Sequence, residues 1–230
     1  MTRQNAVSCG VAAVVVALLV LPATAQDADP VKAAAAAVQQ NDPDKVDPNL
    51  IKGETWTFDL RFDHPQPLVV TTPGGEKEVY WYLVYTVTNR AAEGKTYIPT
   101  FTLFSDAATV RRAGVFPTVF EAIKKNRKIR FLENAVKMHG KVLPGLDNAR
   151  TGVAIFAPID RRTDRFTIFC EGLSGQYIER PNLKAKPDAP ADEKLIRLRK
   201  TLAITYKLPG DKWWLNQDQP IFISKKWTWR

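Results

Sequence analysis

The chain has 230 residues and a formal net charge of +9, with 33 Lys and Arg against 24 Asp and Glu. This length suits one domain, or one domain with an insertion. The chain has two cysteines, Cys9 and Cys170. If Cys9 is removed with an N-terminal signal, an intramolecular disulfide is excluded, so a packed core must hold the protein together.

The N-terminus has the parts of a secretory signal peptide, and residues 1–25 are assigned to it. Arg3 is followed by an apolar run over 11–21, and Ala23-Thr24-Ala25 supplies small residues for cleavage after Ala25. The apolar run is shorter than the about 20 residues of a membrane helix. An uncleaved anchor is the alternative. The prediction is a secreted or periplasmic protein with no transmembrane segment after cleavage.

Residues 26–49 are predicted to be a linker or a loosely attached helix. "VKAAAAAVQQ" has helix-forming composition, and Pro43 and Pro48 interrupt it. A flexible arm that reaches a partner is the alternative. The folded domain is then expected over 50–230.

From Thr55 the pattern changes to alternation. The side chains of Trp56 to Phe62 alternate apolar and polar, which predicts a half-buried strand. "VYWYLVYTVTN", residues 79–89, is large and β-favouring at both odd and even positions, so it is predicted to be a central strand. Its even face is where a ligand groove would lie. The next strand is expected over 97–104, where Pro99 indicates an edge position or a bulge.

One segment breaks the β pattern and predicts a short helix over 115–126. Phe116, Val119, Phe120 and Ile123 fall at helical spacing. Cations cluster at its end, where they suit the helix dipole. They form a basic segment that is either a solvated helix end or an anion-binding patch: Lys124, Lys125, Arg127, Lys128 and Arg130.

Strand signals resume after the basic segment. Residues 136–142 are expected on one strand, and "TGVAIFAPI" and "RFTIFCEGL" are expected to form a hairpin around "DRRTD". The proline-rich stretch 179–194 predicts a long surface loop. Two further strands end the chain at Arg230. About eight strands with turns between them predict an antiparallel β-sandwich.

The order of these features resembles secreted bacterial immunoglobulin-like β-sandwich domains. "WYLVYTVTN", "FTLFSDAATV", "VLPG" and "TGVAIFAPIDRRTDRFTIF" carry the resemblance, which covers residues 55–173. It implies an immunoglobulin-like scaffold that is generally non-enzymatic, and it implies no catalytic or ligand residues. The segment from Leu195 departs from the minimal pattern.

Motifs for chemistry are sparse. His64, His139 and Cys170 lack the spacing of a structural zinc site, and no phosphate-binding glycine motif occurs. "GLSGQ" has Gln176 where a serine-hydrolase elbow needs glycine. No metal, cofactor or catalytic residue is predicted. A hydrolase built from unidentified carboxylates is the least favoured alternative.

The remaining candidates are charge and aromatic surface. The first hypothesis is a non-catalytic interaction or structural module of the cell envelope, which contacts an anionic component or protein through the basic segment. Nucleic acid is not the expected partner outside the cytoplasm. The alternative is a carbohydrate-binding module, in which exposed indole rings stack on sugars. Its candidate residues are Trp213, Trp214, Trp227 and Trp229, of which burial is the favoured interpretation for the last two.

Overall fold

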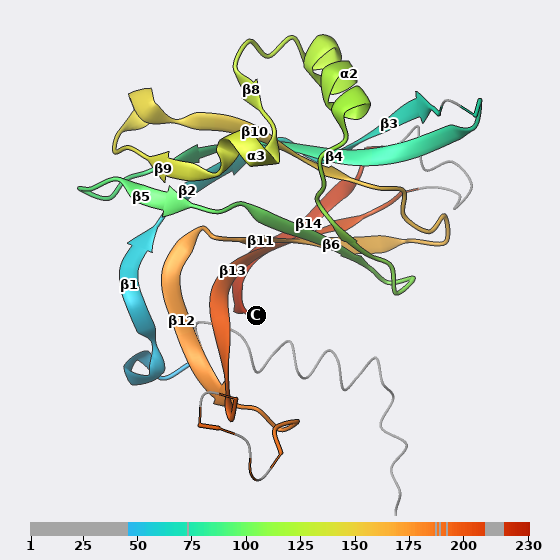
Figure 1. Ribbon diagram of the computed structural model, residues 1–230. Helices are drawn as coiled ribbons and strands as arrows, with labels where there is room; N and C mark the ends of the chain where they lie inside the picture. The colour runs from blue at the N-terminus through green and yellow to red at the C-terminus, as the bar shows by residue number, and fades with distance from the viewer. Residues whose placement is uncertain (1–45, 73, 187, 189, 192, 210–218) are drawn as a thin grey trace, which may run out of the picture.

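The computed structural model describes residues 46–72, 74–186, 188, 190–191, 193–209 and 219–230. Within them the protein is mostly β, with two sheets that contribute to one shared core (Figure 1). The prediction of a mainly β protein with antiparallel sheets is therefore confirmed. The predicted signal peptide and residues 26–45 lie outside the described residues. In the described part, no helix is both long and apolar enough to cross a bilayer.

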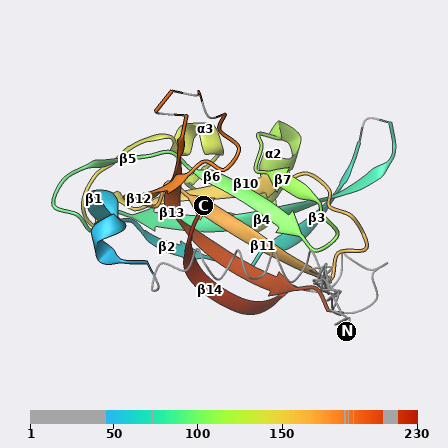
Figure 2. The same cartoon turned by 90° about the horizontal axis from the view of Figure 1, so that it is seen from below.

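The larger sheet has seven strands in the order β1-β12-β13-β11-β6-β7, and β14 pairs with β13. The first part of β13 pairs with β12, while its second part pairs with both β11 and β14. Figure 1 shows β1, β12 and the start of β13 extending below the rest of the molecule, and Figure 2 shows β14 beside β13. The strands are β1 (Lys52–Thr57), β6 (Thr100–Ser105), β7 (Val110–Arg112), β11 (Arg165–Glu171), β12 (Ser174–Pro181), β13 (Leu195–Lys207) and β14 (Ile221–Trp229).

The second sheet has five strands in the order β2-β4-β10-β8, and β3 also pairs with β4. Its strands are β2 (Asp59–Phe62), β3 (Gln66–Thr71), β4 (Lys77–Thr88), β8 (Leu132–Glu133) and β10 (Arg150–Phe156), with β8 parallel to β10. A separate pair joins β5 (Lys95–Tyr97) to β9 (Gly140–Val142). The helices are α2 (Pro117–Arg127), α3 (Ala135–Met138) and the 3-10 turns η2 (Pro48–Leu50) and η3 (Leu146–Asn148).

Strand β4 lies between β10 and the pair β2 and β3, which confirms its predicted central position. Its odd positions, such as Trp81 and Leu83, are fully buried in the core between the sheets. Its even positions are covered as well, because Tyr82 and Val84 pack in one cluster with Val119 and Ile123 of α2. The even face is therefore covered by a helix instead of forming an open ligand groove.

The predicted hairpin around "DRRTD" is wrong, because its two strands belong to different sheets. Strand β10 pairs with β4 and β8, whereas β11 pairs with β6 and β13. Residues 157–164 carry the chain from one sheet to the other, and Ile159 in this connection is buried in the main core. A charged connection between two apolar strands looks the same in sequence whether it joins neighbours or facing sheets.

The prediction of about eight strands is too low, since the described residues form fourteen. Two expected strands are each divided between different sheets. The alternating run around Phe58 divides into β1, which pairs with β12, and β2, which pairs with β4. The run around Pro99 divides into β5 and β6. Alternation continues through such a switch, so the period alone does not show where a strand changes partner.

Three further boundaries differ from the prediction. The expected strand over 136–142 begins as helix α3, because the Asn134 side chain caps it by accepting a hydrogen bond from the Lys137 N–H. The long loop begins at Asn182 and not at 179, since β12 pairs with β13 as far as Pro181. Val46 is buried with Ile178 and Trp229, so residue 46 packs with the domain and not in a linker.

Candidate functional site

Helix α2 positions the basic segment on the outer side of the five-stranded sheet (Figure 1). It starts at Pro117, a residue suited to the first turn, and buries Val119 and Ile123. It ends where Lys128 adopts a left-handed conformation with φ 54° and donates its backbone N–H to the Lys124 carbonyl. The observed bounds agree closely with the predicted helix over 115–126, and they place the cations in and just after the last turn.

The five cations of the basic segment differ in their partners. Arg127 forms an ion pair with Asp63 and also donates a hydrogen bond of 3.4 Å to the Gln66 side-chain oxygen. The other four side chains are exposed, and within the described part of the chain none of them makes an ion pair with a carboxylate: Lys124, Lys125, Lys128 and Arg130. Arg127 therefore anchors the helix, while the remaining cations are available to an anionic partner.

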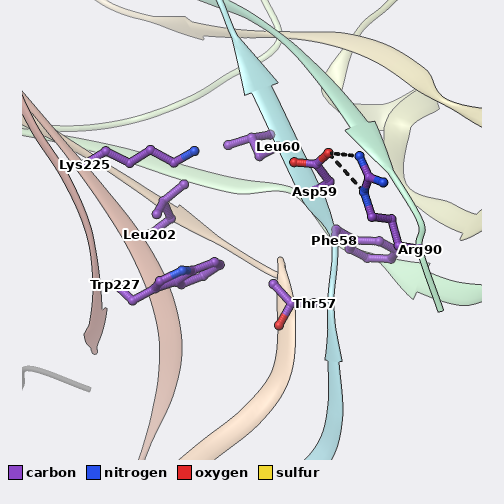
Figure 3. A pocket seen from close by; sticks show the side chains of 8 residues that line it. All are labelled: Thr57, Phe58, Asp59, Leu60, Arg90, Leu202, Lys225 and Trp227. Carbon is purple, nitrogen blue, oxygen red and sulfur yellow. Dashed lines mark hydrogen bonds and ion pairs between the residues drawn. The ribbon is translucent and has the colours of Figure 1, made fainter. Parts of the chain in front are cut away.

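A second candidate site is a cavity of about 380 Å³ beside Trp227 (Figure 3). Strand β2 lines one side of it, and strands β13 and β14 line the other. Its apolar walls are continuous with the main core, because Phe58, Leu60 and Leu202 belong to both. The cavity thus lies at the margin between the two sheets, above three core side chains that are at most 5% exposed.

Charged groups surround the apolar part of this cavity. Arg90 pairs with Asp59 at 2.9 Å, and this pair lies on the β2 side (Figure 3). Lys225 extends from β14, with its ammonium 5.3 Å from the Phe62 ring centroid, and it makes no ion pair among the described residues. Such a site can bind a hydroxylated or acidic ring. The indole of Trp227 offers a stacking surface, and Lys225 and the Asp59–Arg90 pair offer polar and charged contacts.

The predicted aromatic set is only partly brought together. Trp227 is half-buried, lines the cavity and carries the Lys200 ammonium 5.4 Å from its ring centroid. Trp229 is 1% exposed, packs with Val46 and Ile178, and cannot stack on a ligand. Its inclusion in the candidate glycan surface is therefore wrong, whereas its favoured burial is confirmed. Trp213 and Trp214 lie outside the described residues.

The other chemistry-bearing side chains are dispersed. In the described ranges no group of three or more His, Cys, Asp or Glu side chains is placed to hold a metal ion. Cys170 is fully buried in the main core, and this burial raises the pKa of its thiol. The ring of His64 lies 5.8 Å from that of Tyr206, centroid to centroid. These groups line neither candidate site.

The cavity was not predicted from the sequence. Its charged residues come from three distant segments of the chain, namely Asp59, Arg90 and Lys225. Each is a single charged residue in an alternating or loop sequence. A local pattern carries no signal for such a set, because only the pairing of β2 with β4 and of β14 with β13 brings it together. Comparison of the chain with protein-family models, curated proteins and solved structures found no match.

Proposed function

We propose that the protein is a non-catalytic module of the cell envelope that binds an anionic partner through the basic segment. The observation that carries this proposal is the group of four exposed cations at the end of α2 that form no ion pair with any described carboxylate. In most of a mixed surface, cations alternate with acids that cancel their field. Near the segment, Asp63 is already paired with Arg127, and Glu121, one turn before Lys124 and Lys125 on α2, offsets only part of the charge of the four remaining cations. The free cations therefore attract anions from solution.

The proposal includes export and an immunoglobulin-like scaffold. Arg3, the apolar run over 11–21 and the small residues before Gln26 support removal of a signal peptide, which leaves a chain of net charge +8. The two sheets that share one core support a sandwich scaffold that presents α2 on its outside. We infer that the mature protein acts in the periplasm or outside the cell.

Co-sedimentation with isolated envelope material tests this function. The protein beginning at Gln26 is expected to bind at low salt and to dissociate at high salt. Salt screens the attraction between exposed charges, and at 0.1 M its range is already only about 10 Å. Replacing Lys124, Lys125 and Lys128 together by Ala should weaken binding roughly a hundredfold at low salt.

The matched control replaces three exposed lysines far from α2 in the sequence, namely Lys184, Lys194 and Lys207, and so removes the same charge. This variant should bind almost like the original protein. If both variants lose binding equally, binding depends only on the net charge of the protein. That result would contradict a dedicated basic segment. Absence of binding at either salt concentration would contradict the envelope module itself.

The cavity beside Trp227 supports a second candidate function, which is glycan binding. The specific observation is a half-buried indole that lines an open cavity next to the ammonium of Lys225, which lies near the Phe62 ring and forms no ion pair with a described residue. A sugar ring can stack on the indole while an acidic substituent reaches the ammonium. Trp227 serves this role without Trp229, which is buried in a different cluster.

Calorimetric titration with oligosaccharides from envelope polymers tests the glycan candidate, because its signal does not depend on the indole that is replaced. Trp227→Ala should abolish the titration, and Lys225→Ala should weaken binding of acidic more than neutral oligosaccharides. Lys226→Ala is the control, because its exposed side chain does not line the cavity. Retention of binding in Trp227→Ala would contradict this second function.

A further inference from the structure

We propose that the anionic partner of the basic segment is the surface of an anionic lipid bilayer, and that Phe131 inserts into it. This inference rests on the proposed function, and it specifies both the partner and the residue that makes apolar contact with it. Phe131 was not a candidate from the sequence, where it follows Arg130 and precedes the short strand β8.

Phe131 lies exposed at the end of the connection from α2 to β8. Its side chain is 74% exposed, although the next residue, Leu132, is only 6% exposed and packs under α2. In Figure 1 this connection lies on the side of the molecule opposite the long hairpin of β12 and β13. The backbone therefore holds a large aromatic side chain outward at one end of the protein.

Other exposed apolar side chains occur in the elements around this connection. Val115, just before α2, is 49% exposed, and Val136 in α3 is 68% exposed. Val115 and Leu132 also line a cavity of about 220 Å³ between α2 and α3. Single exposed apolar residues are ordinary on protein surfaces, so the inference rests on Phe131, which is the largest and the most exposed of these three side chains.

Cations border this apolar group on several elements. The Arg130 guanidinium lies 5.1 Å from the centroid of the Phe131 ring. Lys124 from α2 and Lys137 from α3 line the same cavity as Val115. Long basic side chains can keep their charged ends at phosphate level while their methylene stems follow an inserted aromatic ring. Lys125 and Lys128 add two further exposed cations beside the connection.

This combination favours a lipid surface over an acidic protein. A protein ligand that is held tightly needs shaped pockets for its own side chains. Here the aromatic group projects outward, and the neighbouring cavity is small and lined by Lys124 and Lys137 together with one carboxylate, Glu121. A projecting aromatic ring with cations around it matches the interface of an anionic bilayer, where apolar insertion and headgroup attraction add together.

Vesicle binding tests the inference with the protein that begins at Gln26. Vesicles of phosphatidylglycerol and phosphatidylcholine are compared with vesicles of phosphatidylcholine alone, and a soluble polyanion, dextran sulfate, is measured in parallel. Phe131→Ala should weaken binding to the anionic vesicles roughly tenfold and leave dextran sulfate binding unchanged. Leu183→Ala is the matched control, since Leu183 is 95% exposed in the loop between β12 and β13.

A fluorescent label reports insertion directly. The variant Phe131→Cys can be labelled with an environment-sensitive dye, because the native Cys170 is fully buried. The dye emission should shift to the blue with anionic vesicles and stay unchanged with phosphatidylcholine vesicles. The same dye attached through Leu183→Cys should not shift with either.

The outcomes separate this inference from the proposed function. Binding to dextran sulfate without binding to vesicles would overturn the lipid partner and leave an anionic partner of another class, such as an acidic protein. Vesicle binding with no dye shift and no effect of Phe131→Ala would overturn insertion. Absence of binding to both vesicles and dextran sulfate would overturn the proposed function as well.

Discussion

Arg127 in the last turn of α2 forms an ion pair with Asp63, which lies between β2 and β3. The same guanidinium donates to the Gln66 oxygen, which also accepts a 2.8 Å hydrogen bond from the Tyr82 hydroxyl. The end of the helix is thereby connected to the sheet beneath it. Arg127 and Lys125 are thus neighbouring members of one basic segment with different roles, because Arg127 has a carboxylate partner and Lys125 has none among the described residues.

Alanine substitutions should separate these roles. Arg127→Ala is expected to lower the free energy of unfolding by about 0.5 kcal/mol, the range of a partly exposed ion pair. Lys125→Ala should leave it unchanged, because its side chain makes no ion pair with the described residues. Urea unfolding measures both. A larger loss in Lys125→Ala than in Arg127→Ala would contradict the assignment.

Gly172, between β11 and β12, is expected to be intolerant of a side chain. Its φ is +81°, and an added β-carbon would lie 2.3 Å from the Ile98 carbonyl oxygen. Gly172→Ala should therefore cost about 2 kcal/mol or more, through backbone strain and displacement of the segment around Ile98.

Gly75 provides the matched control for this substitution. Its φ is +83°, but nothing lies within 4 Å of an added β-carbon. Gly75→Ala should cost only the backbone strain, about 1 kcal/mol. Thermal or urea unfolding compares the two variants, and equal losses would show that the contact with Ile98 adds nothing.

The Cys170 thiol should be unreactive in the folded protein. It is fully buried in the main core, and burial raises its pKa, so that a thiolate does not form at neutral pH. A chromogenic disulfide reagent should detect no thiol in the native protein that begins at Gln26 and one thiol after denaturation. Rapid reaction without denaturant would contradict the burial of Cys170.

Stability should fall in alkaline solution. Burial raises the pKa values of the Tyr85, Tyr97 and Tyr206 hydroxyls and of the Cys170 thiol in the fold. The contribution of these groups is fully present below the pKa values of the unfolded chain. For the phenols, this contribution to stability is lost as the pH rises above about 10. Above that pH the unfolded chain releases protons that the folded protein retains.

Tyr206→Phe isolates one of these groups. The Tyr206 hydroxyl is buried and has no hydrogen-bond partner among the described residues. Its removal should raise the free energy of unfolding at neutral pH by about 1 kcal/mol. It should also reduce the loss of stability between about pH 9 and about pH 11, the range around the pKa of a free phenol. Urea unfolding as a function of pH provides the measurement. An unchanged pH profile would contradict the raised pKa.

Local periodicity was sufficient for several elements. The continuous large side chains around Trp81 predicted a central strand, and the helical spacing of Val119 and Ile123 predicted α2. Both patterns work because the buried face of an element depends on the residue spacing within that element. The partners of a strand are not encoded in this way. Phe58 and Pro99 stand where the chain changes partner strands, and nothing in the alternation marks the change.

The sequence by itself determined that the protein is mainly β, with a cluster of cations at the end of one amphipathic helix, because charge and period are properties of short segments. Tertiary structure decided which cationic and aromatic side chains are exposed to a binding partner. Arg127 forms an ion pair with Asp63, which lies 64 residues away in the chain. Trp227 and Trp229 have the same parity on β14, yet Trp227 lines a cavity and Trp229 is covered by Val46 and Ile178. Exposure depends on which distant segments pack over a side chain, and no local pattern carries that information.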